Sequence, residues 1–267
     1  MNQFFSFKRF SLLVLKHWAD NKRRYSLSVL ALTGLLTGWF VLMMLGESGN
    51  PMNEEIQRAA YFFFLFAAGA FYASQYFGDL GSKGKGSNFL LVPASSFEKL
   101  LCAVLFAVLL FFVAFTAVFY LVDVVMVNIA NSYWADSGKV PVTNILKATV
   151  LEFNDGWAMR LLLLYIPVQS AFLLGSVYFE RYSFIKTIIS GFAAFLIVFG
   201  LVYLLYSQFD PWQNIPEGAL ASSGADPDEY PVPVPAWIGK TYRFIVMYAF
   251  APFFWIVAYY RLKEKQV

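Results

Sequence analysis

The sequence contains little of the chemistry that soluble enzymes and metalloproteins use. It has one cysteine, Cys102, and one histidine, His17, among 267 residues. A single cysteine excludes a disulfide within the chain, and the pair is too few for a zinc or haem site built from these residue types. Charged residues make up only 14%, against roughly 25% in soluble domains. We therefore expect one transmembrane domain over residues 1–267, with no soluble domain beside it.

Catalytic and nucleotide-binding motifs are also missing. The chain has no HExxH, no GxSxG and no pair of carboxylates within one apolar segment. Gly84-Lys85-Gly86-Ser87 does not have the GxxxxGK[ST] spacing of a phosphate-binding loop, and no strand pattern precedes it. We expect no catalytic residue, metal, cofactor or nucleic-acid partner, so the chain is not expected to be an enzyme. Energy for any transport would come from another chain.

What the sequence has in abundance is apolar residues. Hydrophobic residues make up 59% and aromatic residues 20%, and the mean hydropathy is +0.58. A membrane-spanning helix needs about 20 mostly apolar residues. Six segments qualify: Tyr25–Leu45, Ala59–Tyr76, Lys99–Val127, Leu161–Phe179, Lys186–Tyr206 and Thr241–Tyr260. The pattern predicts an all-α integral membrane protein with a six-helix bundle over 25–260, surrounded by membrane lipids. The third segment is long enough to project beyond the hydrocarbon on one side.

The basic residues predict the orientation of these spans. With the N-terminus in the cytoplasm, fourteen lysines and arginines fall inside and six fall outside. That bias is the one expected from the positive-inside rule. Both termini are therefore predicted to be cytoplasmic, with residues 261–267 as a short tail, and an even number of spans agrees with this.

Residues 1–24 are predicted to form an amphipathic helix and its anchor. Helical spacing places Phe4, Phe7, Phe10 and Trp18 on a broad apolar face, while a narrower stripe carries Arg9, Lys16, His17 and Asp20. Such a helix lies in the membrane interface. Asn21–Arg24 would then turn the chain into the first span. We interpret His17 as part of the interfacial polar face, in preference to a catalytic role.

The polar, Gly-rich passage Gly81–Leu101 lies between the second and third spans. Ser95 and Glu98 have the spacing of a capping box, in which each side chain bonds the backbone amide of the other residue. The passage is either a docking element at the cytoplasmic surface or an ordinary connector, and we favour docking. The candidate docking residues are Lys83, Lys85, Phe89, Leu90, Leu91, Pro93, Ser95 and Glu98.

Three polar residues in or near the spans are candidates for a transport pathway: Gln75, Asp123 and Gln169. An ionisable residue within a span is a functional candidate. The alternative for Asp123, which we favour, is a position at the outer headgroup level. For Gln169, close to Pro167, the commoner explanation is a kink with a helix–helix hydrogen bond.

The layout resembles the membrane subunit of ABC transporters of the ABC-2, or type V exporter, class. The shared features are the amphipathic helix before the first span, the six spans and the cytoplasmic loop between spans two and three. Phe89-Leu90-Leu91-Val92-Pro93-Ala94-Ser95-Ser96-Phe97-Glu98-Lys99 is similar to an LLLPAS-x-x-EK passage in ABC-2-like membrane proteins of Bacteroidota. The resemblance implies a bacterial inner-membrane permease. It also implies a separate ATPase docked on this loop and a homodimer or heterodimer of permeases.

A second hypothesis is a non-transporting scaffold or assembly factor. The loop 207–239 is acidic at Glu217, Asp226, Asp228 and Glu229, and it would bind a partner outside the membrane. A membrane enzyme is the weakest alternative, because no catalytic constellation supports it.

Overall fold

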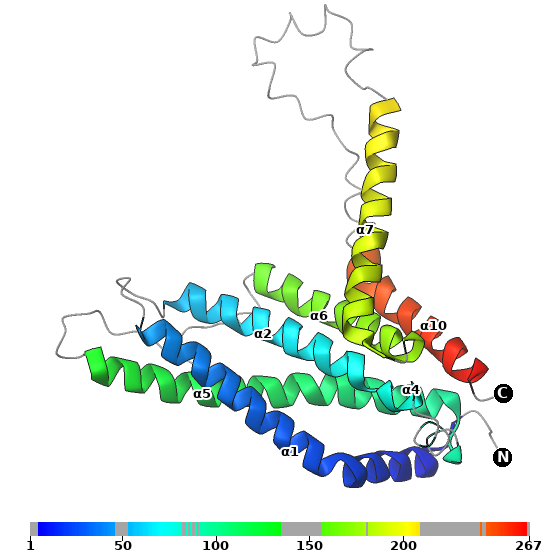
Figure 1. The fold of residues 1–267 in the computed structure, drawn as a ribbon, viewed down its shortest axis with the longest axis horizontal. Coiled ribbons are helices and arrows are strands. Elements are labelled where there is room, and N and C mark those ends of the chain that lie inside the picture. The colour runs from blue at the N-terminus through cyan, green and yellow to red at the C-terminus, as the bar shows by residue number, and fades with distance from the viewer. Residues whose placement is uncertain are drawn as a thin grey trace, which may run out of the picture.

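The computed structural model describes residues 5–45, 53–81, 84, 86, 89, 91–134, 156–179, 181–208, 241 and 244–265. All regular secondary structure in these residues is helical. Helices α1 (Phe7–Leu45), α2 (Glu54–Gln75), α5 (Phe111–Trp134) and α6 (Gly156–Tyr178) extend along the long axis of the molecule (Figure 1). Five helical segments among the described residues are long and apolar enough to cross a membrane. The chain is thus an all-helical, multi-pass membrane protein, as its composition predicts.

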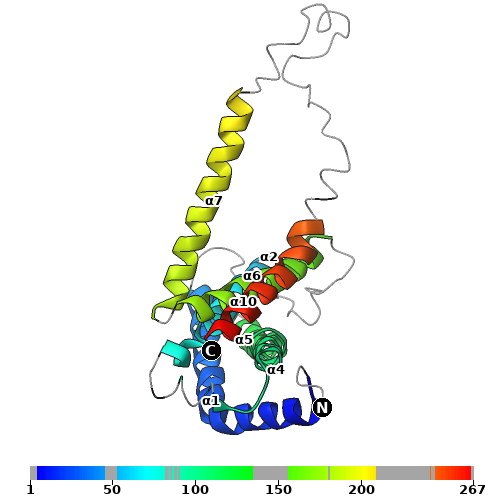
Figure 2. The same cartoon turned by 90° about the vertical axis from the view of Figure 1, so that its right-hand side faces the viewer.

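Helix α1, Phe7–Leu45, joins the predicted amphipathic helix to the first span. Its first turns lie across one end of the bundle, and the helix then bends to run along it (Figure 2). The sequence predicted a turn at Asn21–Arg24. This prediction is wrong, because the backbone of these residues is helical. No proline occurs within α1 to end the helix. Within the helix, the side-chain amide of Asn21 donates to the His17 carbonyl at 3.0 Å.

Helix α2, Glu54–Gln75, begins at a capped turn ahead of the predicted start at Ala59. The Asn53 side chain accepts a hydrogen bond from the Ile56 amide at 2.8 Å, which satisfies one of the amide groups left open at a helix start. The helix packs on α5 and on α6, Gly156–Tyr178. Tyr61 is fully buried at the centre of this packing and lies edge-on to Phe119. Its hydroxyl is 3.0 Å from that of Thr116, so aromatic rings form the core while their polar atoms remain paired.

The third span belongs to a continuous helical stretch of 39 residues, Ser96–Trp134. It consists of α4, Ser96–Val104, a π-helical segment, Leu105–Leu110, and α5, Phe111–Trp134. At about 1.5 Å per residue the stretch is about 58 Å long, nearly twice the roughly 30 Å of a bilayer core. This length is what the prediction of a third helix projecting beyond the hydrocarbon requires, and its position relative to the membrane stays a prediction. Tyr165 of α6 donates to the Val108 carbonyl at 3.1 Å, which pairs a backbone oxygen within the π-helical segment.

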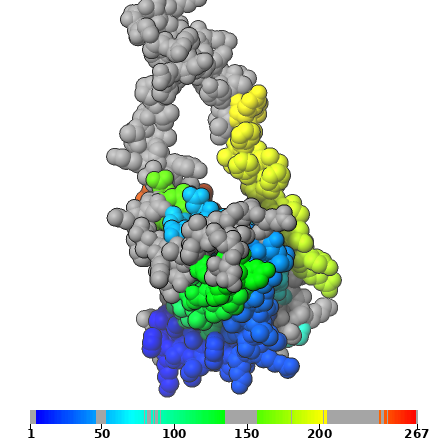
Figure 3. Space-filling model, turned by 90° about the vertical axis from the view of Figure 1, so that its left-hand side faces the viewer, coloured from blue at the N-terminus to red at the C-terminus, as the bar shows by residue number. Residues whose placement is uncertain are grey.

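Helix α7, Ser183–Gln208, begins after a tight turn in which Tyr182 has a φ of 55°. It stands away from the other long helices (Figures 1 and 3), and the side chains of residues 188–199 are exposed. Its base is fixed by close packing of Gly175 against Thr187. Most of its apolar surface is therefore left for lipid or protein to cover.

Helix α10, Phe250–Glu264, follows a π-helical segment, Ile245–Ala249, and packs on α6. It is not among the five segments that qualify as membrane spans in the described residues. The six-span count and the cytoplasmic position of the termini therefore stay predictions. The start of α1 and the end of α10 do lie at the same end of the molecule (Figure 1), as an even number of crossings requires.

The packing at the base of α7 gives a direct test. A methyl group at position 175 would overlap the Thr187 side chain, whereas one at Gly38 would meet no atom within 4 Å. We expect Gly175→Ala to lower the apparent melting temperature of the protein in detergent. Gly38→Ala should leave it unchanged or raise it, because alanine is favoured over glycine in a helix by about 0.5–1 kcal/mol.

The double variant Gly175→Ala, Thr187→Ala removes the overlapping hydroxyl and methyl and should recover most of the lost stability. Equal melting temperatures for Gly175→Ala and Gly38→Ala would show that this contact does not fix α7.

Candidate functional site

The predicted capping box is present at the start of α4. The Glu98 amide donates to Ser95 Oγ at 3.1 Å, and the Ser95 amide donates to Glu98 Oε2 at 2.9 Å. Ser95 has the extended backbone of a cap residue, with φ −68° and ψ 157°. These two bonds satisfy amide groups that would otherwise be open at the helix start. Ser95 and Glu98 thus fix the point at which the polar passage becomes helix.

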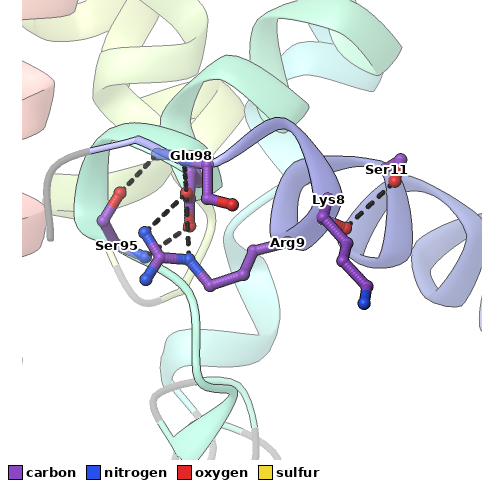
Figure 4. A network of polar contacts seen from close by, with 6 residues as sticks. Lys8, Arg9, Ser11, Ser95 and Glu98 are labelled. Atoms are coloured by element: carbon purple, nitrogen blue, oxygen red, sulfur yellow. Dashed lines mark hydrogen bonds and ion pairs between the residues drawn. The ribbon is translucent and has the colours of Figure 1, made fainter. Parts of the chain in front are cut away.

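Glu98 also binds the N-terminal end of the described chain. Its Oε1 accepts from the Ser6 amide at 2.7 Å, from Arg9 Nε at 3.2 Å and from an Arg9 Nη atom at 3.0 Å (Figure 4). The Glu98 side chain is fully buried, while that of Arg9 is 35% exposed. A buried carboxylate is tolerated only where charge and hydrogen bonds compensate for lost water. We call this arrangement of Ser6, Arg9, Ser95 and Glu98 the Glu98 latch.

Lys99 follows Glu98 and is also buried, with only 2% of its surface exposed. Its ammonium group lies 5.3 Å from the centre of the Phe89 ring, within the range of a cation–π contact. The Phe89 ring packs edge-on against Phe77, just after the end of α2, with 5.9 Å between the ring centroids. The passage before α4 is therefore held at two points, through the Glu98 latch and through Phe89.

The structure divides the predicted docking residues into an exposed group and a buried group. Leu91 is 79% exposed, and Pro93 is also exposed. Glu98 is buried, so it cannot touch a partner and instead positions the passage. Phe89 is half-buried, and Ser95 is committed to the cap. Lys83, Lys85 and Leu90 lie outside the described side chains.

His17 lies in an aromatic environment that the sequence pattern did not indicate. Its ring stacks on Tyr76 at 5.0 Å between centroids and contacts Phe106 at 4.6 Å. Its Nε2 atom is 2.6 Å from the Tyr25 hydroxyl in a hydrogen bond. The sequence pattern placed His17 on the interfacial polar face of the helix, and in the structure the ring is half-buried against these aromatic side chains. The spacing of eight residues between His17 and Tyr25 gives no sign of this contact in a straight helix.

The three pathway candidates do not form one site. Gln75 is exposed at the end of α2, where its Oε1 accepts from Arg24 at 3.3 Å. Asp123 is fully buried in α5, and its position at the outer headgroup level stays a prediction. It follows Tyr120 by one turn, at the level of Tyr61.

Gln169 of α6 is fully buried against Gly69 of α2. Its side-chain oxygen and nitrogen have no hydrogen-bond partner among the described residues. The helix–helix hydrogen bond that the sequence suggested for this residue is therefore not formed within the described part of the chain. A buried amide without partners is costly, and glycine at position 69 provides the space that it occupies.

The described residues contain no group of three or more His, Cys, Asp and Glu side chains that could hold a metal. No protein-family model, curated protein or solved structure matches the chain.

The Glu98 latch can be tested with two neighbouring basic residues. Arg9 binds Glu98, whereas Lys8 is exposed (Figure 4). We expect Arg9→Met to destabilise the protein by about 1–3 kcal/mol, below the roughly 3–5 kcal/mol for breaking a fully buried pair, because Arg9 is partly solvated. Lys8→Met should change stability little. Thermal unfolding in detergent measures both.

A double-mutant cycle then isolates the interaction. Arg9→Met combined with Glu98→Gln should cost less than the sum of the two single changes, since each removes the same ion pair. Additive effects would mean that the two residues contribute independently to stability.

Proposed function

We propose that this chain is the membrane-spanning permease subunit of an ABC-type transporter, driven by a separate ATPase subunit. The ATPase docks on the passage between α2 and α4, and two permease subunits enclose the pathway. In this proposal the chain has six spans with both termini in the cytoplasm, and it resides in a bacterial inner membrane. The resemblance of residues 89–99 to the ABC-2 class supports this assignment.

The observation that carries the proposal is the connection between an exposed passage and a long helix. Leu91 and Pro93 are presented outward, a few residues before the Glu98 latch fixes the start of α4. From that point one continuous helical stretch of 39 residues runs to Trp134. A push on the passage would therefore be carried toward the opposite end of the bundle along one helical stretch.

The Glu98 latch also connects the passage to the N-terminal turns of α1. Because Arg9 and Ser6 bind the same carboxylate, movement at the start of α4 also moves the N-terminal turns of α1. Those turns lie across the end of the bundle (Figure 2). A partner at the passage would thus act on a spanning helix and on an interfacial helix together, as coupling of ATP hydrolysis to transport requires.

The exposed surface should be tested with a matched pair of substitutions. Leu91→Asp places a charge on the proposed contact, and Tyr182→Asp places one on a residue of similar exposure, 77%, in the turn before α7. We expect Leu91→Asp to weaken association with the ATPase by about tenfold or more, as loss of a central apolar contact does. Tyr182→Asp should have little effect.

The measurement is purification of the tagged chain from its native membrane, followed by identification of any phosphate-loop ATPase and assay of its ATP turnover. Equal association and turnover for both variants would exclude docking at Leu91. If no ATPase and no ATP turnover accompany the wild-type chain, the permease assignment is wrong and a scaffold acting through residues 207–239 becomes the better hypothesis.

A further inference from the structure

A cavity of about 440 Å³ lies between the bend of α1, the end of α2 and the passage before α4. This volume is within the range of small-molecule sites, roughly 300–1,000 Å³. The predicted docking surface and pathway do not account for it. One wall of the cavity is polar and another is apolar, and this difference indicates the class of ligand that the cavity binds.

One wall is polar and carries net positive charge. Lys16, Asn21 and Arg24 line it from α1, with His17 beside them, and Asp20 is the one carboxylate among the lining residues. Lys16 and Arg24 against Asp20 leave one formal positive charge with His17 neutral. The Arg24 guanidinium donates to Gln75 at 3.3 Å, so the contact with α2 holds it at the cavity.

The opposite wall is apolar. Phe77, Leu80, Phe89 and Val92 line it from the end of α2 and the passage that follows. Arg24 and Gln75 also line a second cavity of about 400 Å³. That cavity includes Phe71 and Ile185, which are exposed apolar residues at the side of the bundle. The two cavities are therefore adjacent, with Arg24 and Gln75 in the lining of both.

The position along α1 places these cations at the membrane interface. Three basic residues, Lys22, Arg23 and Arg24, come just before an apolar stretch whose Leu27 and Leu30 are exposed. Exposed leucines of a spanning helix face hydrocarbon, and the basic residues that precede them lie at the level of the lipid headgroups. Lipid phosphates occupy the same level.

We propose that the cavity binds one anionic phospholipid, with its phosphate at the wall that carries Lys16 and Arg24. Asn21 and His17 face the headgroup, and the acyl chains extend over the apolar wall. The proposal rests on the cavity and its charges, and it holds whether or not the chain is a transporter.

The test uses the full-length chain purified in a neutral detergent and titrated with phosphatidylglycerol labelled on an acyl chain. We expect saturable binding of one lipid per chain. The variant Lys16→Gln, Arg24→Gln should bind about tenfold to thirtyfold more weakly, because each basic residue near anionic lipid contributes about a factor of five. The control Lys22→Gln, Arg23→Gln makes the same change in net charge on neighbouring residues that do not line the cavity, and it should bind like wild type.

Three further measurements identify the class of ligand. Phosphatidylcholine should not compete, and glycerol 3-phosphate should not displace the lipid, because it lacks the apolar part. Lys16→Arg, Arg24→Lys should retain binding, which separates lost charge from lost folding. Equal loss in both glutamine variants, or equal binding of phosphatidylcholine, would overturn the proposal. Full displacement by glycerol 3-phosphate would overturn the lipid assignment and make a soluble phosphate ester the ligand.

Discussion

The buried carboxylate of Glu98 is the constraint on which the organisation of one end of this protein depends. A carboxylate without water must find its hydrogen bonds and its countercharge in the protein. Glu98 obtains them from segments far apart in the chain, because Arg9 and Ser6 precede it by about ninety residues. The hydrogen bonds and ion pair that Glu98 needs thus bring the N-terminal turns of α1 to the start of α4. The same contacts fix the end of the passage that precedes α4.

Beyond that end, the bundle is held by packing of aromatic rings and close helix contacts. Helices α2, α5 and α6 share an apolar core around Tyr61, Phe115 and Phe119. The Tyr165 hydroxyl bonds a carbonyl of the π-helical segment, so even the irregular turn is satisfied from a neighbouring helix. Helix α7 lacks comparable support along its length and is held at its base, where Gly175 packs against Thr187 and the Phe184 ring stacks on Phe172. The described structure therefore combines a well-packed core with one helix whose apolar surface is available.

Features that depend on local spacing could be predicted from the sequence. The capping box of Ser95 and Glu98 needs only residues three apart, and the apolar segments need only composition. The Arg9–Glu98 ion pair could not be predicted, because nothing in a single sequence links residues 9 and 98. The environment of His17 was missed for a related reason. A helical projection shows which residues share a face of one helix, but it cannot show that Tyr76 and Phe106, far along the chain, pack against His17.

The cavity and the passage before α4 share residues, and this has a thermodynamic consequence. Phe89 and Val92 line the cavity, whereas their neighbours in the chain, Leu91 and Pro93, face outward. A partner that shifts Leu91 must shift Val92 and so alter the apolar wall of the cavity. Coupling between two sites is reciprocal, so a ligand in the cavity would change the affinity of the partner by the same factor. If both proposals hold, the composition of the surrounding lipid regulates the contact through which the ATPase acts.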